Sequence, residues 1–154
     1  MQKLNLPEYS GARICRDGDV LKIFDRIRKK FVTLTPEEWV RQNFVNHLIE
    51  NLGYPASLIA NERGIELNGT SRRCDTVVFD RYGSPAMIVE YKAPTVNITQ
   101  DVFDQIVRYN LVLHARFLIV SNGMTHYCCE IDTTTGAYTF LSAIPDYETV
   151  KGPK

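Results

Sequence analysis

Two acidic residues and a lysine lie in a stretch, Arg72 to Pro94, whose pattern predicts a β-hairpin. Asp75 falls in the first predicted strand, and Glu90 and Lys92 fall two positions apart in the second. Because strand side chains alternate between the two faces of a sheet, Glu90 and Lys92 share one face. Carboxylates beside an ammonium group could hold a divalent cation and stabilise negative charge on a substrate.

The predicted register places the two carboxylates opposite each other. A four-residue loop over 81–84, a length common in hairpins, pairs Asp80 with Pro85. Counting back gives the pairs Val77–Ile88, Asp75–Glu90 and Arg73–Lys92. Like charges directly opposite one another destabilise a hairpin, so a bound cation, two arginines or solvent should compensate. Both strands are apolar around these positions, which favours a site over an exposed hairpin with scattered charges.

Two predicted helices could position this hairpin. Thr35 is a good N-cap, and Glu38 three residues later completes a capping box, so a helix is expected from Pro36 to about residue 52. A second helix is expected over about 100–113, with an N-cap within 97–99. On this second helix Gln105 and Tyr109 are spaced by four and lie along one stripe.

The remaining pattern predicts strands over 57–67 and 116–120 and a final hairpin of 125–131 with 137–142. A further hairpin is expected over 12–24. The order of helix, three strands, helix, strand and hairpin predicts an α/β fold with a mixed sheet and flanking helices. We expect one domain: an arm and hairpin (1–34), a core (35–122), a C-terminal hairpin (123–145) and a loose tail (146–154).

The composition limits the class of protein. With 154 residues, 44% of them hydrophobic and 23% charged, the chain fits a soluble domain with a real core. The zero net charge argues against nucleic-acid binding driven by bulk charge. Residues 1–34 nevertheless hold eight basic and four acidic side chains. The run RIRKK could meet a phosphate backbone, although such a run is more often a solvated edge.

The cysteines and apolar runs predict a cytoplasmic location. The four cysteines form no Cys-x-x-Cys pair, so structural zinc is not expected, and reduced, mostly buried thiols are the better interpretation. No signal peptide is visible, and no apolar run approaches the length of a membrane span.

The sequence resembles a known nuclease family. Asp75 followed by Glu90-Tyr91-Lys92 resembles the D…E-x-K signature of the PD-(D/E)XK nuclease superfamily, which alone is common by chance. Four ordered segments resemble the N-terminal nuclease domain of type I restriction enzyme R proteins: TPEEWVRQ, RRCDTVVFDRYGSPAMIVEYKAP, DQIVRYN and RFLIVSNG. This resemblance covers about residues 20–142. Cys74 stands where the superfamily name has proline, at a position that varies.

The resemblance implies a restriction-endonuclease-like αβββαβ core and cleavage of DNA phosphodiester bonds that depends on Mg²⁺ or Mn²⁺. It implies that Asp75 and Glu90 hold the metal, with the backbone carbonyl of Tyr91 as a further ligand. Lys92 would orient or activate the attacking water and stabilise charge on the phosphate. A hard cation with oxygen ligands and a nearby positive group suits phosphodiester hydrolysis.

Three further residues match supporting elements of related nucleases. Gln105 and Tyr109 match a Q-x-x-x-Y element that supports the site. Glu38 matches an acidic residue of the first helix that often joins the metal site. The capping box explains Glu38 equally well without catalysis, so its role stays open.

Other functions also stay open. The same fold could serve as a catalytically silent nucleic-acid- or protein-binding module, or as a structural interaction domain that never meets DNA. No G-x-x-x-x-G-K-[ST] motif is present, so the sequence contains no ATP-driven motor of that kind. Affinity for DNA would then come from a separate motor or specificity subunit, from a homodimer, or from the basic N-terminal segment.

Overall fold

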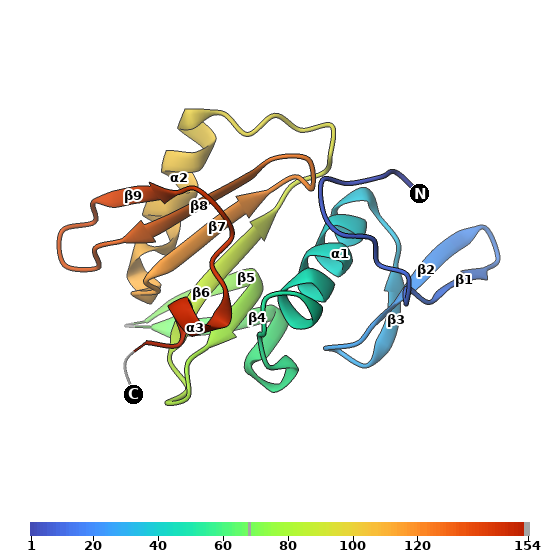
Figure 1. Cartoon of the computed structure of the whole chain (residues 1–154), viewed down its shortest axis with the longest axis horizontal. Coiled ribbons are helices and arrows are strands. Elements are labelled where there is room, and N and C mark those ends of the chain that lie inside the picture. Colours follow the sequence, from blue (N-terminus) through green and yellow to red (C-terminus); the bar gives the residue numbers. More distant parts are fainter. Residues whose placement is uncertain (68, 153–154) are drawn as a thin grey trace.

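A six-stranded mixed sheet forms the centre of the computed structural model, which describes residues 1–67 and 69–152 (Figure 1). The side chains at positions 65, 67, 70, 72, 109 and 112 lie outside the described part. In chain order the elements are β1 (Ile14–Asp17), β2 (Val20–Asp25), β3 (Lys30–Thr33), α1 (Pro36–Glu50), the 3₁₀ turn η1 (Ala56–Leu58), β4 (Ile59–Leu67), β5 (Thr70–Phe79), β6 (Pro85–Tyr91), α2 (Gln100–Asn110), the 3₁₀ turn η2 (Leu111–Leu113), β7 (Phe117–Ser121), β8 (His126–Ile131), β9 (Tyr138–Leu141) and α3 (Tyr147–Val150).

The strands of the large sheet follow the order β4-β5-β6-β7-β8-β9. Only β6 and β7 are parallel, and the chain passes between them through α2, whereas the other neighbouring pairs are antiparallel. The predicted succession of helix, three strands, helix and strand is therefore confirmed as α1-β4-β5-β6-α2-β7. The final predicted hairpin is β8 with β9.

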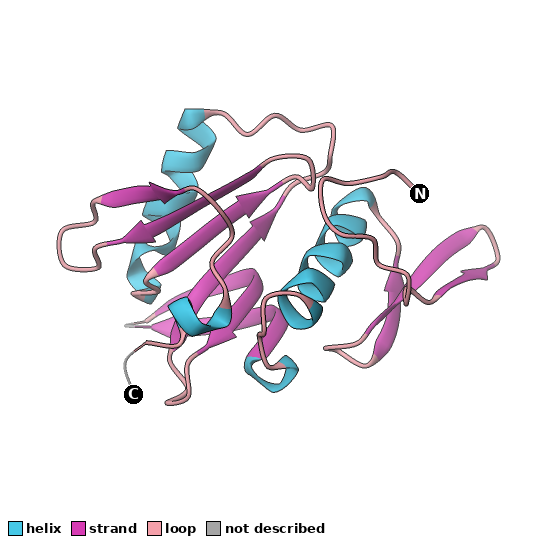
Figure 2. Cartoon of the chain, viewed as in Figure 1, coloured by secondary structure: helices cyan, strands magenta, loops and turns pink. Residues whose placement is uncertain are grey.

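Two apolar cores lie on opposite faces of this sheet, whose strands and neighbouring helices Figure 2 shows in separate colours. Val40 and Phe44 of α1 pack with residues such as Val89 on one face. Phe103 and Val107 of α2 pack on the other face, against a set that includes Val77, Ile88 and Leu118. Burial on both faces explains why β6 and β7 are almost continuously apolar.

The start of α1 follows the predicted signals only in part. The Thr35 hydroxyl accepts a hydrogen bond from the Glu38 amide at 3.0 Å, as an N-cap does. The Thr35 amide donates to the Thr33 carbonyl at 3.1 Å rather than to the Glu38 side chain. The predicted capping box is therefore wrong in its second half, and the Glu38 carboxylate is available for other contacts.

A third strand near the N-terminus was not expected from the sequence. The predicted hairpin over 12–24 is confirmed as β1 with β2, but β3 pairs with β2 to make a separate three-stranded sheet. β3 is only four residues long and mostly exposed, so it has no apolar alternation that would reveal a strand. In Figure 1 this small sheet lies beyond α1, away from the large sheet.

The predicted loose tail is wrong for residues 146–150. They include the short helix α3, which begins at an Asp146 N-cap and buries Val150 to 4% exposure. The Tyr147 amide donates to the Leu52 carbonyl at 2.9 Å, and the Tyr54 hydroxyl donates to the Pro145 carbonyl at 2.7 Å. One helical turn is too short for a periodic pattern to reveal it.

In the part of the chain that the structure describes, no helix is both long and apolar enough to cross a membrane.

Candidate active site

The β5–β6 ladder agrees with the prediction in its centre and departs from it at both ends. Val77 pairs with Ile88 as predicted. At the loop end a bulge lets Phe79 pair with Pro85, so the predicted Asp80–Pro85 pair is wrong. The Asp80 carboxylate instead accepts hydrogen bonds within the loop, from the amides of Tyr82 and Ser84.

At the other end the regular ladder stops one residue before the two carboxylates. Its last pair among the described residues is Thr76–Val89, so the predicted ladder pairs Asp75–Glu90 and Arg73–Lys92 do not form. In place of a ladder bond, the Tyr91 amide donates to the Asp75 carboxylate at 2.9 Å. The side chain of Asp75 thus takes the place of a backbone acceptor where the two strands separate.

The backbone of Asp75 is held from a different direction. Arg41 of α1 donates through Nη1 to the Asp75 carbonyl oxygen at 2.7 Å. On the β4 side, the pairs Asn61–Thr76 and Arg63–Cys74 are made, but Glu62, which lies between them, is in the left-handed region with φ of 56°. A non-glycine residue in this region is uncommon and marks local strain. Asp75 therefore sits at an irregular point shared by three strands.

Glu90 is the second carboxylate of the site and is half-buried. Burial, the negative charge of Asp75 and a hydrogen bond between the two carboxyl groups raise the pKa of Glu90 to about 8. A hydrogen bond with Asn110 and the charge of Lys92 act in the opposite direction. The predicted closeness of the two carboxyl groups is thus confirmed, although it arises beyond the ladder rather than within it.

Asn110, at the end of α2, contributes a polar atom that has no partner. The residue is 3% exposed, and its amide nitrogen donates to the Ile106 carbonyl at 3.0 Å. Its buried oxygen Oδ1 accepts no hydrogen bond from the described residues. An unsatisfied buried oxygen is rare in a native protein. Because the Asn110 side chain lies beside Glu90, a water molecule or a cation bound at the pair could satisfy this oxygen.

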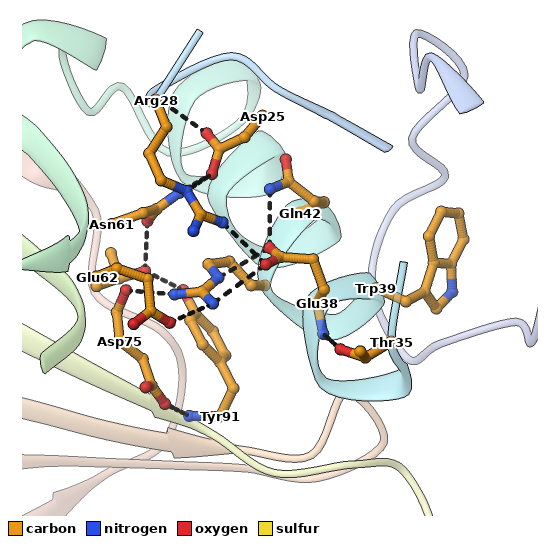
Figure 3. Close-up of polar contacts among 12 residues, drawn as sticks. Asp25, Arg28, Thr35, Glu38, Trp39, Gln42, Asn61, Glu62, Asp75 and Tyr91 are labelled. Carbon is orange, nitrogen blue, oxygen red and sulfur yellow. Dashed lines mark hydrogen bonds and ion pairs between the residues drawn. The ribbon is translucent and has the colours of Figure 1, made fainter. Parts of the chain in front are cut away.

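Glu38 lies in a buried network of charged and polar groups between α1, β2 and β4 (Figure 3). Its carboxylate accepts from Arg28 at 2.8 Å, from Arg41 Nε at 2.9 Å and from Gln42 at 3.0 Å. Burial alone would lower the pKa of Arg41, but its hydrogen bonds to Glu38 and Glu62 raise it above the ordinary value. Arg41 is therefore a permanent cation, and Glu38 orients it.

The same network fixes the strand neighbours of Asp75. The Tyr91 hydroxyl donates to Thr76 at 2.9 Å, and the Thr76 hydroxyl donates to Asn61 at 2.7 Å. The ring of Tyr91 lies 5.9 Å from the Arg41 guanidinium. The Glu62 carboxylate accepts a hydrogen bond from Arg41 Nη2 at 2.6 Å and one from Arg73 Nε at 2.7 Å. The backbone that carries Asp75 and the Tyr91 carbonyl is consequently well supported.

The structure gathers some predicted site residues and separates others. Asp75 and Glu90 lie together at the junction of β5 and β6, and Lys92 follows directly after β6, where its amide donates to the Ser121 carbonyl at 2.8 Å. The Glu38 carboxylate forms ion pairs with Arg28 and Arg41 and does not join the Asp75–Glu90 pair. Gln105 is exposed on α2. The side chain of Tyr109 lies outside the described residues.

Arg41 and Asn110 are site residues that the sequence did not reveal. Arg41 follows Glu38 by three, and such a pair on a helix usually indicates only a surface ion pair. Asn110 ends the helix on which Gln105 and Tyr109 were chosen, and its only signal is a polar residue before the apolar turn η2. Neither position carries a motif.

The donor set fits a hard divalent cation. In the described part of the chain, no group of three or more histidine, cysteine, aspartate or glutamate side chains is arranged to hold a metal. The Asp75–Glu90 pair offers two carboxylates, which is the number that Mg²⁺ commonly takes alongside water and substrate phosphate. Burial is the main cause of the raised pKa of Glu90, and the charge of Asp75 adds to it, so a cation beside the two carboxyl groups would favour the ionised form of Glu90.

Comparison with known families places the chain in one of them. A family model described as type I restriction enzyme R protein N terminus matches residues 36–145, which include the pair of carboxylates, Lys92 and Arg41. The chain belongs to this family. The family match confirms the resemblance to type I restriction R proteins that the sequence suggested.

A solved structure supports the fold of this family member. The chain is similar to a fragment of a protein assigned as an HsdR subunit of a type I restriction enzyme from Vibrio vulnificus YJ016, with a TM-score of 0.53 and 23% identity. The match covers 76% of this chain and 24% of that chain, so this chain spans about a quarter of its relative. This likeness confirms the predicted mixed α/β fold. No curated protein matches the chain.

Proposed function

We propose that this domain is a metal-dependent DNA endonuclease of the PD-(D/E)XK kind, using Mg²⁺ or Mn²⁺ to hydrolyse phosphodiester bonds. The observation that carries the proposal is the pair Asp75–Glu90, two carboxyl groups in contact at a half-buried point beside Lys92. Membership of the type I restriction R-protein family supports it. The same membership suggests that the domain works on DNA together with a motor or specificity subunit, or as a homodimer.

Each residue of the site has a distinct task in this proposal. Asp75, Glu90 and the Tyr91 carbonyl would hold the cation, and the Asn110 oxygen would accept a hydrogen bond from one of its waters. The bound cation would polarise the phosphoryl oxygen and lower the pKa of a coordinated water. Lys92 would donate to the scissile phosphate, orient the attacking water and stabilise the charge that develops.

Glu38 takes a different task from the one that the resemblance suggested. Its two carboxylate oxygens already accept hydrogen bonds from Arg28, Arg41 and Gln42. We propose that Glu38 is a positioning residue, which holds Arg41 against the Asp75 carbonyl. Helix α2 would support the face of the sheet that carries Glu90. Gln105 and Tyr109, both on α2, keep their proposed supporting role.

Plasmid cleavage tests the proposed activity. Supercoiled plasmid is incubated with the protein and Mg²⁺ or Mn²⁺, with EDTA as the blank, and nicked and linear products are measured. Wild type should cleave, and Asp75→Asn and Glu90→Gln should lose at least a hundredfold in rate because each removes a metal ligand. Asp101→Asn, an exposed position on α2, is the matched control. Equal rates for wild type and Asp75→Asn would end the nuclease proposal.

A second candidate function is a catalytically silent nucleic-acid- or protein-binding module. The observation in its favour is that Arg28 and Arg41 form ion pairs with Glu38. Glu38 is therefore not free to join Asp75 and Glu90 as a third carboxylate. A silent module would bind DNA without metal, and its binding would survive Glu90→Ala. Loss of binding in that variant alone would count against it.

A further inference from the structure

The small sheet β1–β3 contains the excess positive charge of the chain. Residues 12–33 include seven lysines and arginines and three aspartates. Since the whole chain has 18 basic and 18 acidic residues, the remainder holds 11 basic and 15 acidic ones. A neutral protein is thus divided into a cationic sheet and an anionic body. Such an asymmetry creates a local potential that attracts polyanions even when the net charge is zero.

Several of these basic side chains are already paired within the protein. Lys22 lies 3.1 Å from Asp17, and Arg26 lies 3.0 Å from Glu50. Arg28 is committed to the buried network with Glu38. Four others, Arg13, Arg16, Lys29 and Lys30, are exposed and form no ion pair with any described residue. These four positive charges are available to a partner.

Arg13 is held in place by two aromatic rings. Its guanidinium lies 4.6 Å from the centre of the Phe24 ring and 5.6 Å from that of Phe31. The two rings pack edge to face with centres 5.2 Å apart. Because the guanidinium covers the rings, they are poor platforms for stacking unpaired bases. The strand register places Arg13, with Phe24 and Phe31, on the face of the small sheet opposite Arg16 and Lys30, so Arg13 is not part of the same surface.

The sheet is rigidly anchored on its inner side. Asp25 is fully buried and accepts from the amides of Ile27 and Arg28 at 2.7 and 2.9 Å, which shapes the turn before β3. Asn61 of β4 donates to the other oxygen of Asp25 at 3.0 Å (Figure 3). Burial would raise the pKa of Asp25, but the hydrogen bonds from Arg28 and Asn61 lower it, so this anchor is ionised at neutral pH.

The anchor also ties the small sheet to β4, the strand that pairs with β5 on either side of Asp75. Asn61 precedes Glu62, the strand neighbour of Asp75. A cavity of about 210 Å³ is lined in part by Leu21 of β2, by Leu34, which directly follows β3, and by Pro94, two residues after Lys92. A strand of DNA at Lys92 would therefore be within reach of the sheet.

We propose that the small sheet β1–β3 is a DNA-contacting surface, on which Arg16, Lys29 and Lys30 bind the phosphate backbone of duplex DNA. This inference rests on the proposed function for its choice of DNA as the polyanion. It assigns the affinity of the domain to an element outside the catalytic motif. The element starts before the segment that the family model matches, which begins at residue 36.

A binding experiment without metal tests the surface separately from cleavage. A fluorescein-labelled duplex is titrated in EDTA at several KCl concentrations, and anisotropy gives Kd. The sheet variant replaces Arg16, Lys29 and Lys30 by Gln and leaves Arg13 on its rings. The control variant replaces Arg108, Arg116 and Lys151 by Gln, which removes the same charge from the α2 side and the C-terminal end of the chain.

The two variants should differ clearly. The sheet variant should bind at least tenfold more weakly at 100 mM KCl, and the slope of log Kd against log salt should fall by about 0.9 for each phosphate that the variant no longer neutralises. The control variant should stay within about twofold of wild type. Equal Kd values for the sheet and control variants, or no binding by wild type at 50 mM KCl, would contradict the proposal that the small sheet binds DNA. Wild type that binds as described but fails to cleave plasmid would overturn only the proposed nuclease.

Discussion

Asp75 is bonded through both its side chain and its backbone, and these bonds define the candidate centre. The carboxylate accepts from the Tyr91 amide and the carbonyl accepts from Arg41, so neither group takes part in a regular ladder. A residue held in this way has little freedom to move away from Glu90. When Glu90 ionises, the two carboxylates therefore stay close and repel each other, and a cation would relieve that repulsion.

Lys92 is the residue whose role is most specific to catalysis. Replacing it by Gln should lower the cleavage rate by about a hundredfold or more, the scale expected when one electrostatic stabiliser of a transition state is removed. Metal binding and the circular dichroism spectrum should change little. Lys3→Gln, on the exposed N-terminal arm, is the control. A Lys92→Gln enzyme with a wild-type rate would show that Lys92 only neutralises the carboxylates.

The pKa of Glu90 predicts an unusual dependence of stability on pH in the absence of metal. Its folded pKa of about 8 exceeds the ordinary 4.5, so the folded state binds the proton more tightly than the unfolded state. The stabilisation is complete below about pH 4.5 and is lost as pH rises to about 8. Each tenfold difference in proton affinity is worth about 1.4 kcal/mol, so a pKa that rises from 4.5 to about 8 corresponds to a decline of about 4 to 5 kcal/mol.

Urea unfolding in EDTA at pH 5, 6.5 and 8 measures this decline. Glu90→Gln should remove most of the decline and should be more stable than wild type at pH 8, because the amide has no charge to bury. Glu8→Gln, on the exposed arm, should behave as wild type. A wild-type protein whose stability is flat or rises over this range would contradict the assigned pKa.

At the residue scale the sequence identified the motif but not its supports. Asp75, Glu90 and Lys92 were found because their types and spacing carry chemical meaning. Arg41 was missed because its partners come from β4 and β5, elements that are distant in sequence. The role of Glu38 was left open between the metal site and a capping box, and only the structure shows that three donors already occupy its oxygens.

At the scale of elements, α1 clamps the irregular point of the sheet. Arg41 joins α1 to β5 through the Asp75 carbonyl and to β4 through Glu62, while Glu38 holds its guanidinium in plane. Arg41 is only 8% exposed, so removing it leaves a buried carboxylate and a buried carbonyl with fewer partners. Breaking such a pair from one side is typically much more destabilising than removing both partners.

A double-mutant cycle on Arg41→Met and Glu38→Gln tests this clamp by urea unfolding. Arg41→Met alone should lower the free energy of unfolding by about 3 kcal/mol. The double variant should show a coupling energy of at least about 1 kcal/mol, because Glu38→Gln removes the buried carboxylate that Arg41→Met leaves without its partner. Arg73→Met is the control, since its side chain is 72% exposed and should cost under about 1 kcal/mol. If the two substitutions had strictly additive effects on the free energy of unfolding, Arg41 and Glu38 would not be energetically coupled.

Element prediction succeeded where the pattern was long and failed where it was short. The helix from Thr35 and the β5–β6 hairpin have caps or apolar runs of several residues, and both were placed correctly. β3 and α3 are four residues each, too short for periodicity, and they form because partner elements supply the contacts. The register near Asp75 could not be predicted, because it depends on the bond from Arg41 on another element.

At the scale of the whole molecule, the mixed sheet brings the middle of β5 and the ends of β6 and α2 to one place. The parallel pair β6–β7 requires a crossover, and that crossover is α2, which places Asn110 beside Glu90. The small basic sheet lies on the far side of α1 and is tied to β4 by the Asp25–Asn61 bond. The catalytic motif and the proposed DNA surface are thus joined by buried polar contacts.

A bound cation should stabilise the whole fold, because it binds the native state and relieves the carboxyl repulsion. At a Mg²⁺ concentration ten times its Kd, linkage gives about 1.4 kcal/mol, which for a domain of this size is a rise in Tm of about 3 to 5 °C. Thermal unfolding with and without Mg²⁺ measures this rise. Asp75→Asn should abolish it and Asp101→Asn should keep it. An equal rise in wild type and Asp75→Asn would place the stabilising ion elsewhere.

The central claim is that Asp75 and Glu90 together hold a divalent cation. Anomalous diffraction from crystals soaked in Mn²⁺ above pH 8, where Glu90 gives up its proton most readily, tests it most directly. The claim predicts a strong anomalous peak about 2.0 to 2.4 Å from an oxygen of each carboxylate and of the Tyr91 carbonyl. Glu90→Gln crystals soaked in the same way should show a much weaker peak. A wild-type map with no anomalous density between Asp75 and Glu90 would contradict the metal site and the nuclease built on it.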